Sequence, residues 1–221
     1  MKKIKKKIKL KSILVLLGII IFIAVLVYLF LNIRIKNIYV RGINLIKEKD
    51  IITINNLYNY PKILDFNKDD FIKKVKENPL VNDIQVSVSF FGKVVIDIDE
   101  NIPICRKNNK IILSNGKIED IDITKELPIL TNEIDEDVYN EFIKKIVLID
   151  KSIMSKISEI EYSPSTIDKE KFLFLMNDGN MVYITLSKID LVNNYNEIYP
   201  TLDGKKGILH LDSGNHFEIK E

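Results

Sequence analysis

Residues 84–99 read IQVSVSFFGKVVIDID, and this stretch decides the fold of the first folded part of the chain. Apolar and polar residues alternate on both sides of Gly92. Such a period of two is typical of a strand with one buried face, and a glycine between two such runs indicates a hairpin turn. The stretch therefore predicts a β-hairpin whose buried face consists of Ile84, Val86, Val88, Ile96 and Ile98.

The residues before this hairpin predict one strand and two helices. Residues 35–42 alternate and end at a glycine, as a strand and a turn do. Residues 46–58 carry apolar side chains at helical spacing, and Asn67 or Asp69 can cap a second helix, which ends before Pro79. The predicted order is β-α-α-β-β, and we expect a first domain over residues 34–105.

A long apolar segment precedes this domain. Residues 13–31 read ILVLLGIIIFIAVLVYLFL, without a charged side chain. At 1.5 Å per residue such a helix spans about 28 Å, close to the ~30 Å hydrocarbon core of a bilayer. We expect a transmembrane helix over residues 12–33. A cleaved signal peptide would have a shorter apolar region and a small-residue cleavage site.

The distribution of charge predicts the orientation of this helix. Seven lysines precede residue 12, whereas residues 12–221 carry 26 basic and 31 acidic side chains, a net charge of −5. The asymmetry predicts a cytoplasmic tail over residues 1–11 and an extracytoplasmic body in a single-pass membrane protein. A basic tip on a mildly acidic body is not typical of a nucleic-acid-binding protein.

The remaining residues predict a second domain rich in strands, over residues 106–221. Asn115-Gly116 and Asp178-Gly179 are hairpin signals. Helical spacing appears over residues 135–149 and again around residues 189–202. The expected strands cover residues 110–113, 117–121, 127–130, 157–162, 171–176, 181–186, 208–211 and 216–219. The fold class is therefore α+β, with a transmembrane helix and two extracytoplasmic domains, the second of them carrying two helices.

Residues with catalytic or metal-binding chemistry are few. The chain has one cysteine and two histidines, with no phosphate-binding glycine motif and no metal-ligand spacing. Cys105 follows three apolar residues and is expected to pack as a small hydrophobe. Asp97 and Asp99 are interpreted as the solvated side of a strand. We expect no enzyme activity, no metal and no cofactor. The alternative is a membrane-anchored extracytoplasmic enzyme acting on the cell wall, for which His210 and His216 would be the candidate bases.

Seven short motifs follow the membrane anchor in a fixed order: Ile38-Tyr39-Val40-Arg41-Gly42, Asn78-Pro79-Leu80-Val81, Glu100-Asn101-Ile102-Pro103-Ile104-Cys105, Leu127-Pro128-Ile129-Leu130, Ile157-Ser158-Glu159-Ile160, Asn177-Asp178-Gly179 and Ile208-Leu209-His210-Leu211. This series resembles the FtsQ/DivIB family of bacterial cell-division proteins. The β-α-α-β-β unit would be the POTRA domain of that family and residues 106–221 its β domain. Asn101, Cys105 and His210 depart from the family pattern, which favours Arg, Ala and Asp there.

The resemblance implies a function and partners. It implies a scaffold that recruits and stabilises other division proteins at the division septum. The implied partners are the bitopic proteins FtsL and DivIC/FtsB, with indirect contact to the septal peptidoglycan synthases. Strand addition to an exposed sheet edge and helix pairing in the bilayer are the expected physical means.

The resemblance also implies where the partner binds. In the family, the end of the β domain is where the FtsB-type partner docks, and a strand at the end of a sheet leaves free N–H and C=O groups. Two tyrosines four residues apart share one helix face, and tyrosine is frequent in binding hot spots. The alternative is that both tyrosines and Ile208 are core residues. The predicted partner-binding residues are Tyr195, Tyr199, Ile208, Leu209, His210 and Leu211.

Overall fold

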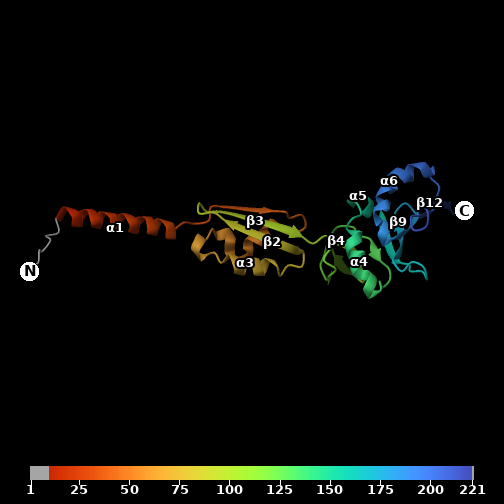
Figure 1. The fold of residues 1–221 in the computed structure, drawn as a ribbon, viewed down its shortest axis with the longest axis horizontal. Coiled ribbons are helices and arrows are strands. Elements are labelled where there is room, and N and C mark those ends of the chain that lie inside the picture. The colour runs from red at the N-terminus through yellow and green to blue at the C-terminus, as the bar shows by residue number, and fades with distance from the viewer. Residues whose placement is uncertain (1–9, 221) are drawn as a thin grey trace, which may run out of the picture. The chain divides into compact units, whose positions relative to one another are not determined.

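The computed structural model describes residues 10–220 and has an α+β fold. It contains an N-terminal apolar helix and two compact units, which divide between Glu100 and Asn101 (Figure 1). The first nine residues, which form most of the predicted cytoplasmic tail, lie outside the described residues. Each unit is described by itself below.

Helix α1 (Leu10–Leu31) contains the apolar segment identified in the sequence. Within residues 10–220, the stretch Ile13–Leu31 is the one helical segment that is long and apolar enough to cross a membrane. From Ile13 to Leu31 its large apolar side chains are about half exposed, as in a helix that other protein elements leave almost entirely uncovered. Exposing the apolar side chains of such a helix to water would be unfavourable.

The first unit has the order β-α-α-β-β that the sequence predicted. Its sheet has the order β1-β3-β2, with β1 parallel and β2 antiparallel to β3. Helix α3 lies on one face of this sheet (Figure 1). In chain order the elements after α1 are β1 (Asn37–Arg41), α2 (Glu48–Thr53), the 3-10 helices η1 (Ile54–Asn59) and η2 (Ile63–Asp65), α3 (Lys68–Val75), β2 (Val81–Val88) and β3 (Lys93–Glu100).

The predicted hairpin register is confirmed for four of its five core positions. These four side chains are at most 5% exposed and pack against Phe71 and Val75 of α3: Ile84, Val86, Ile96 and Ile98. The prediction that Val88 is buried is wrong, because its side chain is 36% exposed. It pairs with Val94 at the turn end of the ladder and lies outside the buried cluster.

The two helices of the first unit differ in how well the sequence predicts them. Asn67 caps α3 as expected, with its side-chain oxygen accepting a hydrogen bond from the Asp70 N–H at 3.0 Å. The predicted helix over residues 46–58 is wrong in length, because α2 already ends at Thr53. Asn55 and Asn56 then adopt left-handed φ angles of 53° and 54°, a conformation that asparagine tolerates and a continuous α-helix does not.

A carboxylate fixes the loop between β1 and α2. The Glu100 side chain accepts hydrogen bonds from the backbone N–H groups of Asn44, Leu45 and Ile46, at 2.8–3.1 Å. Gly42 precedes this loop with a φ of +77°, and a Cβ there would lie 2.0 Å from the Ile98 carbonyl oxygen. Gly42 and Glu100, which both belong to the motifs quoted above, therefore stabilise the same loop.

The second unit is built on a nine-stranded sheet of order β12-β11-β10-β9-β8-β7-β4-β5-β6. Most neighbours are antiparallel; the pairs β4·β7, β7·β8 and β10·β11 are parallel. The strands are β4 (Pro103–Lys107), β5 (Lys110–Leu113), β6 (Ile118–Glu119), β7 (Ile129–Leu130), β8 (Ile157–Tyr162), β9 (Lys171–Met176), β10 (Met181–Thr185), β11 (Gly207–His210) and β12 (His216–Ile219).

Helical segments cover one face of this sheet. Helices α4 (Glu136–Ile146) and α5 (Lys151–Met154) form within and just after the predicted helix over residues 135–149. The predicted α-helix around residues 189–202 is wrong: the chain forms the 3-10 segment η3 (Leu186–Asn194), one α-turn α6 (Tyr195–Ile198) and the 3-10 turn η4 (Tyr199–Leu202). Pro200 stands at the start of η4, where its missing N–H cannot continue an α-helix.

Cys105 packs in the core of the second unit, as the sequence predicted. Its side chain is fully buried among Ile104, Ile112 and Phe142. Burial raises the pKa of the Cys105 thiol to about 12. Phe142 and Phe172 stack on each other in this core, with ring centroids 5.1 Å apart.

Candidate functional site

The C-terminal end of the second sheet is an open edge. Within residues 10–220, β12 pairs with β11 and with no other strand, while β11 also pairs with β10. The backbone groups of Ile208–His210 are therefore already used on both sides. The free edge belongs to β12, so strand addition at this end of the sheet would involve residues 216–219.

The ladder between β11 and β12 indicates which backbone groups point outward. Lys220 donates its N–H to the Lys206 carbonyl at 2.9 Å, and Gly207 donates away from β12, to the Asn180 side chain at 3.0 Å. Hydrogen-bonded and non-bonded pairs alternate along an antiparallel ladder. Phe217 and Ile219 consequently direct their N–H and C=O groups toward the open edge.

Gly207 holds this edge strand close to its neighbour. A Cβ at this position would lie 1.9 Å from the Glu218 carbonyl oxygen and 2.9 Å from the Phe217 ring. No side chain larger than hydrogen fits there without moving β12 away from β11.

Tyr195 lies inside the second unit, where a partner cannot reach its ring. The side chain is 1% exposed, and its hydroxyl donates to Asp178 Oδ2 at 2.7 Å while accepting from Asn180 Nδ2 at 3.0 Å. Burial, together with the acceptor Asp178, raises the pKa of Tyr195. Because Asn180 also accepts from Gly207, Tyr195 holds the start of β11 in place instead of forming a surface.

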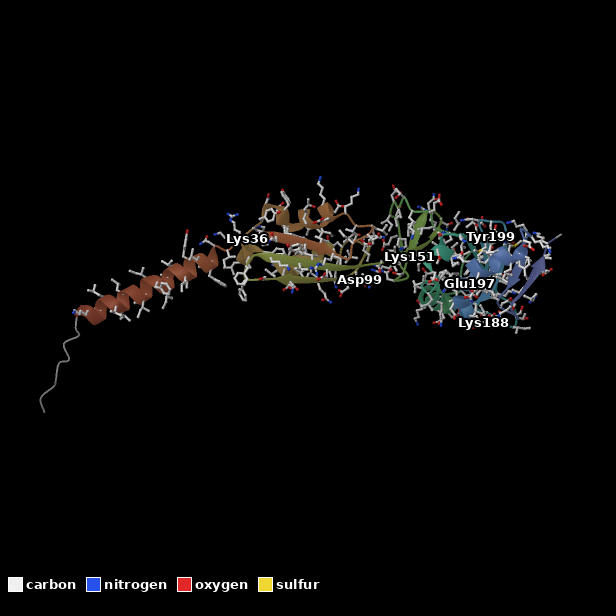
Figure 2. All side chains as sticks on the ribbon, turned by 90° about the horizontal axis from the view of Figure 1, so that it is seen from above. Lys36, Asp99, Lys151, Lys188, Glu197 and Tyr199 are labelled. Atoms are coloured by element: carbon white, nitrogen blue, oxygen red, sulfur yellow. The ribbon has the colours of Figure 1, made fainter. Side chains whose placement is uncertain are left out.

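The other predicted site residues lie on different faces. Leu209 and Leu211 are buried in the core, and Ile208 is half-buried. Tyr199, labelled in Figure 2, is half-buried; its ring stacks on Tyr195 at 6.1 Å, and Lys206 Nζ lies 5.6 Å from its centroid. The structure therefore brings Tyr195 and Tyr199 together, but only Tyr199 retains a partly exposed ring.

His210 belongs to a group of stacked side chains that sequence reasoning missed. We call Lys171, Tyr183, His210 and His216 the stacked group. They come from the four successive strands β9, β10, β11 and β12. Lys171 Nζ lies 4.1 Å from the Tyr183 centroid, Tyr183 stacks on His210 at 5.5 Å, and His210 stacks on His216 at 4.6 Å. The strand register places them side by side, so only knowledge of the pairing could have revealed the group.

Two carboxylates contact this group. Lys171 forms an ion pair with Asp212 at 2.8 Å, and His210 Nε2 lies 3.2 Å from Glu218 Oε2. Burial alone would raise the pKa of Asp212, but the hydrogen bond and charge of Lys171 and the hydrogen bond from Ser213 together outweigh it, and the pKa lies below its usual value. In the described part of the chain, no hydroxyl or thiol donates to either histidine, and no group of three or more acidic, histidine or cysteine side chains has the geometry of a metal site.

Comparisons with known proteins show which proteins the chain is similar to. The family described as POTRA domain, FtsQ-type, matches residues 33–101. Cell division protein DivIB of Bacillus subtilis strain 168 is 29% identical over 209 residues, which cover 89% of this chain and 80% of that protein. Residues 33–101 form a POTRA domain of the FtsQ type, and the chain is similar to DivIB cell-division proteins over most of its length.

Other proteins show the same similarity. Cell division protein DivIB of Listeria monocytogenes is 26% identical over 231 residues, covering 99% of this chain and 85% of that protein. The solved extracytoplasmic domain of DivIB from Geobacillus stearothermophilus aligns with 48% of this chain and 96% of that chain, at 24% identity and a TM-score of 0.39. The similarity to DivIB proteins and helix α1 together support a single-pass membrane protein.

Proposed function

We propose that this protein is a bitopic scaffold of the bacterial division machinery, which recruits and stabilises other division proteins at the septum. Its relatives are named cell-division proteins, and its own POTRA domain and β-rich unit provide sheet edges instead of a recognisable catalytic arrangement. The basic tail would lie in the cytoplasm and both units outside the membrane, as the lysine asymmetry indicates.

The observation that carries this proposal is the open edge of β12. A partner segment in extended conformation would pair with Phe217 and Ile219, the two residues whose backbone groups face outward. Strand addition gains affinity from main-chain hydrogen bonds and specificity from alternate side chains. The Ile219 side chain is 52% exposed and offers an apolar contact for such a segment. From the family resemblance, the partners would be FtsL and DivIC/FtsB-like proteins.

A proline at the edge tests this mode of binding. Ile219→Pro removes an outward N–H and adds a ring on the partner side, without removing a hydrogen bond to β11. Ile219→Ala is the matched control, since it shortens the side chain and keeps the N–H. Full-length variants would be compared for co-purification of the DivIC/FtsB-like protein from the same cell, with circular dichroism reporting the fold.

We expect Ile219→Pro to lose most of the partner and Ile219→Ala to retain most of it. Unchanged capture by a correctly folded Ile219→Pro protein would place the partner site elsewhere. A fluorescent fusion tests the wider role independently: a band at midcell supports a septal scaffold, and uniform membrane fluorescence contradicts it.

A further inference from the structure

The connection between α1 and the first unit is very short. Helix α1 ends at Leu31, and the Ile33 carbonyl already accepts a hydrogen bond from the Ile63 N–H at 2.9 Å. The next residues are fixed in the same way, because Ile35 donates to Pro61 and Lys36 donates to Gly92. Backbone hydrogen bonds to the first unit therefore begin two residues after the end of α1.

The tip of the β2–β3 hairpin lies at this connection. Gly92 has a φ of +85°, and a Cβ there would lie 2.3 Å from the Arg34 carbonyl oxygen. The Phe90 ring centroid is 6.2 Å from that of Phe30, which belongs to the last turn of α1. Lys36 and Asp99 lie toward opposite ends of this unit's sheet (Figure 2), so the tip is at the end where α1 leaves.

Large apolar side chains are exposed at this tip. Phe90 is 73% exposed and Phe91 85% exposed, and Leu64, one residue after the contact with Ile33, is 57% exposed. Neighbouring apolar groups left in water in this way mark an interaction surface. They do not contribute to the core of the first unit, from which all three are absent.

Basic residues surround these apolar side chains. The three segments that meet here, residues 30–37, 60–66 and 88–94, contain Arg34, Lys36, Lys62 and Lys93 but a single carboxylate, Asp65. In the described residues none of the four cations forms an ion pair, although Lys93 Nζ lies 5.1 Å from the Tyr39 ring. Aromatic side chains rimmed by Lys and Arg are the composition that favours the interface of an anionic bilayer.

We propose that the Phe90-Phe91 tip inserts into the surface of the bilayer that α1 crosses, with the four basic side chains against anionic lipid headgroups. The last turn of α1 lies at the edge of the hydrocarbon core, and the tip contacts that turn, so the bilayer surface is the occupant that chain connectivity places against it. Insertion would give the first unit a second attachment to the membrane and restrict its tilt. This inference requires no protein partner and goes beyond the proposed scaffold role.

The absence of tryptophan from the chain permits a direct measurement. Phe91→Trp places a single tryptophan at the tip. Asn82→Trp is the matched control, an exposed position on the same hairpin whose side chain bonds Asp99 at the far end of the ladder. Each full-length variant would be reconstituted into phosphatidylcholine vesicles with and without phosphatidylglycerol, and the emission spectrum and quenching by lipids brominated on their acyl chains would be recorded.

We expect Phe91→Trp to emit at shorter wavelength than Asn82→Trp and to lose most of its emission to brominated lipids. Adding Lys62→Glu and Lys93→Glu to the Phe91→Trp variant should weaken this quenching in the vesicles that contain phosphatidylglycerol. Quenching of Phe91→Trp by aqueous iodide as strong as that of Asn82→Trp would overturn the proposal. A blue shift that depends on protein density, without quenching by brominated lipid, would indicate contact between copies and would also overturn it.

Discussion

The two sheets of this protein are stabilised in different ways. Strands β2 and β3 of the first unit alternate buried and more exposed side chains, and their stability depends on one apolar face packed on α3. In the second unit, strands with a neighbour on both sides, such as β5 and β9, bury consecutive side chains, while the C-terminal edge is fixed by polar contacts around Asn180 and Asp212. The difference suggests that changes of face should damage the first sheet most, and that polar deletions should loosen the second sheet in smaller steps.

The largest effect is expected from a charge on the buried face of the first sheet. Val86→Asp places a carboxylate at a position that is 3% exposed and should lower the free energy of unfolding by about 4 kcal/mol or more. Ser87→Asp, on the opposite face of the same strand, should cost under about 0.5 kcal/mol. Denaturant titration of the full-length protein in detergent measures both. Similar losses would show that the register is not what stabilises this unit.

A glycine from each unit separates steric contact from backbone conformation. Gly42→Ala combines a positive φ with a Cβ 2.0 Å from the Ile98 carbonyl, and should cost about 3 kcal/mol. Gly179→Ala has a similar φ of +89° with no atom within 4 Å, and should cost about 1 kcal/mol. Thermal melting distinguishes the two. A Gly179→Ala loss as large as the Gly42→Ala loss would mean that φ alone accounts for the effect.

A hydroxyl deletion tests the polar contacts of the second unit. Tyr195→Phe keeps the buried ring but leaves Asp178 and Asn180 without the shared hydroxyl, and should cost about 1–2 kcal/mol. Tyr199→Phe is the control, because no hydrogen bond of its hydroxyl is present in the described structure, and should be nearly neutral. If both variants melt like the wild type, apolar packing alone holds the start of β11.

The smallest effect is expected from the pH dependence of Asp212. Its pKa is below the ordinary value in the folded state, so the carboxylate contributes stability above the unfolded pKa of about 3.9, and this contribution is lost as the pH falls through the folded pKa. Asp212→Asn should therefore melt below the wild type near neutral pH, and the difference should shrink as the pH falls below about 4. A constant difference across this range would mean that the ion pair with Lys171 does not stabilise the fold.

Much of the first unit could be predicted from local sequence, because its elements follow local rules. Period-two alternation gave the hairpin, and Asn67 gave the start of α3. The same rules failed at Val88, because burial near a hairpin tip depends on how far α3 reaches over the sheet. They also failed at Asn55 and Asn56, where left-handed residues end the helical pattern.

The candidate site was less predictable, because it depends on which strands pair. Helical spacing placed Tyr195 and Tyr199 on a common face, and the rings do stack, but spacing could not tell that the face points into the core. The stacked group of Lys171, Tyr183, His210 and His216 depends on the parallel pairing of β10 with β11. These strands are far apart in sequence, so no local pattern predicts the group. The role of Glu100 in holding residues 44–46 is hidden for the same reason.

The burial of Cys105 has a consequence for redox chemistry. The attacking species in thiol–disulfide exchange is the thiolate, and burial both removes access to this sulfur and raises the pKa of the thiol to about 12. In an oxidising compartment the folded protein would therefore resist mixed disulfides and oxidation at its only cysteine. A second cysteine introduced on the surface would be the sole reactive thiol, so probes could be attached at one chosen position without replacing Cys105.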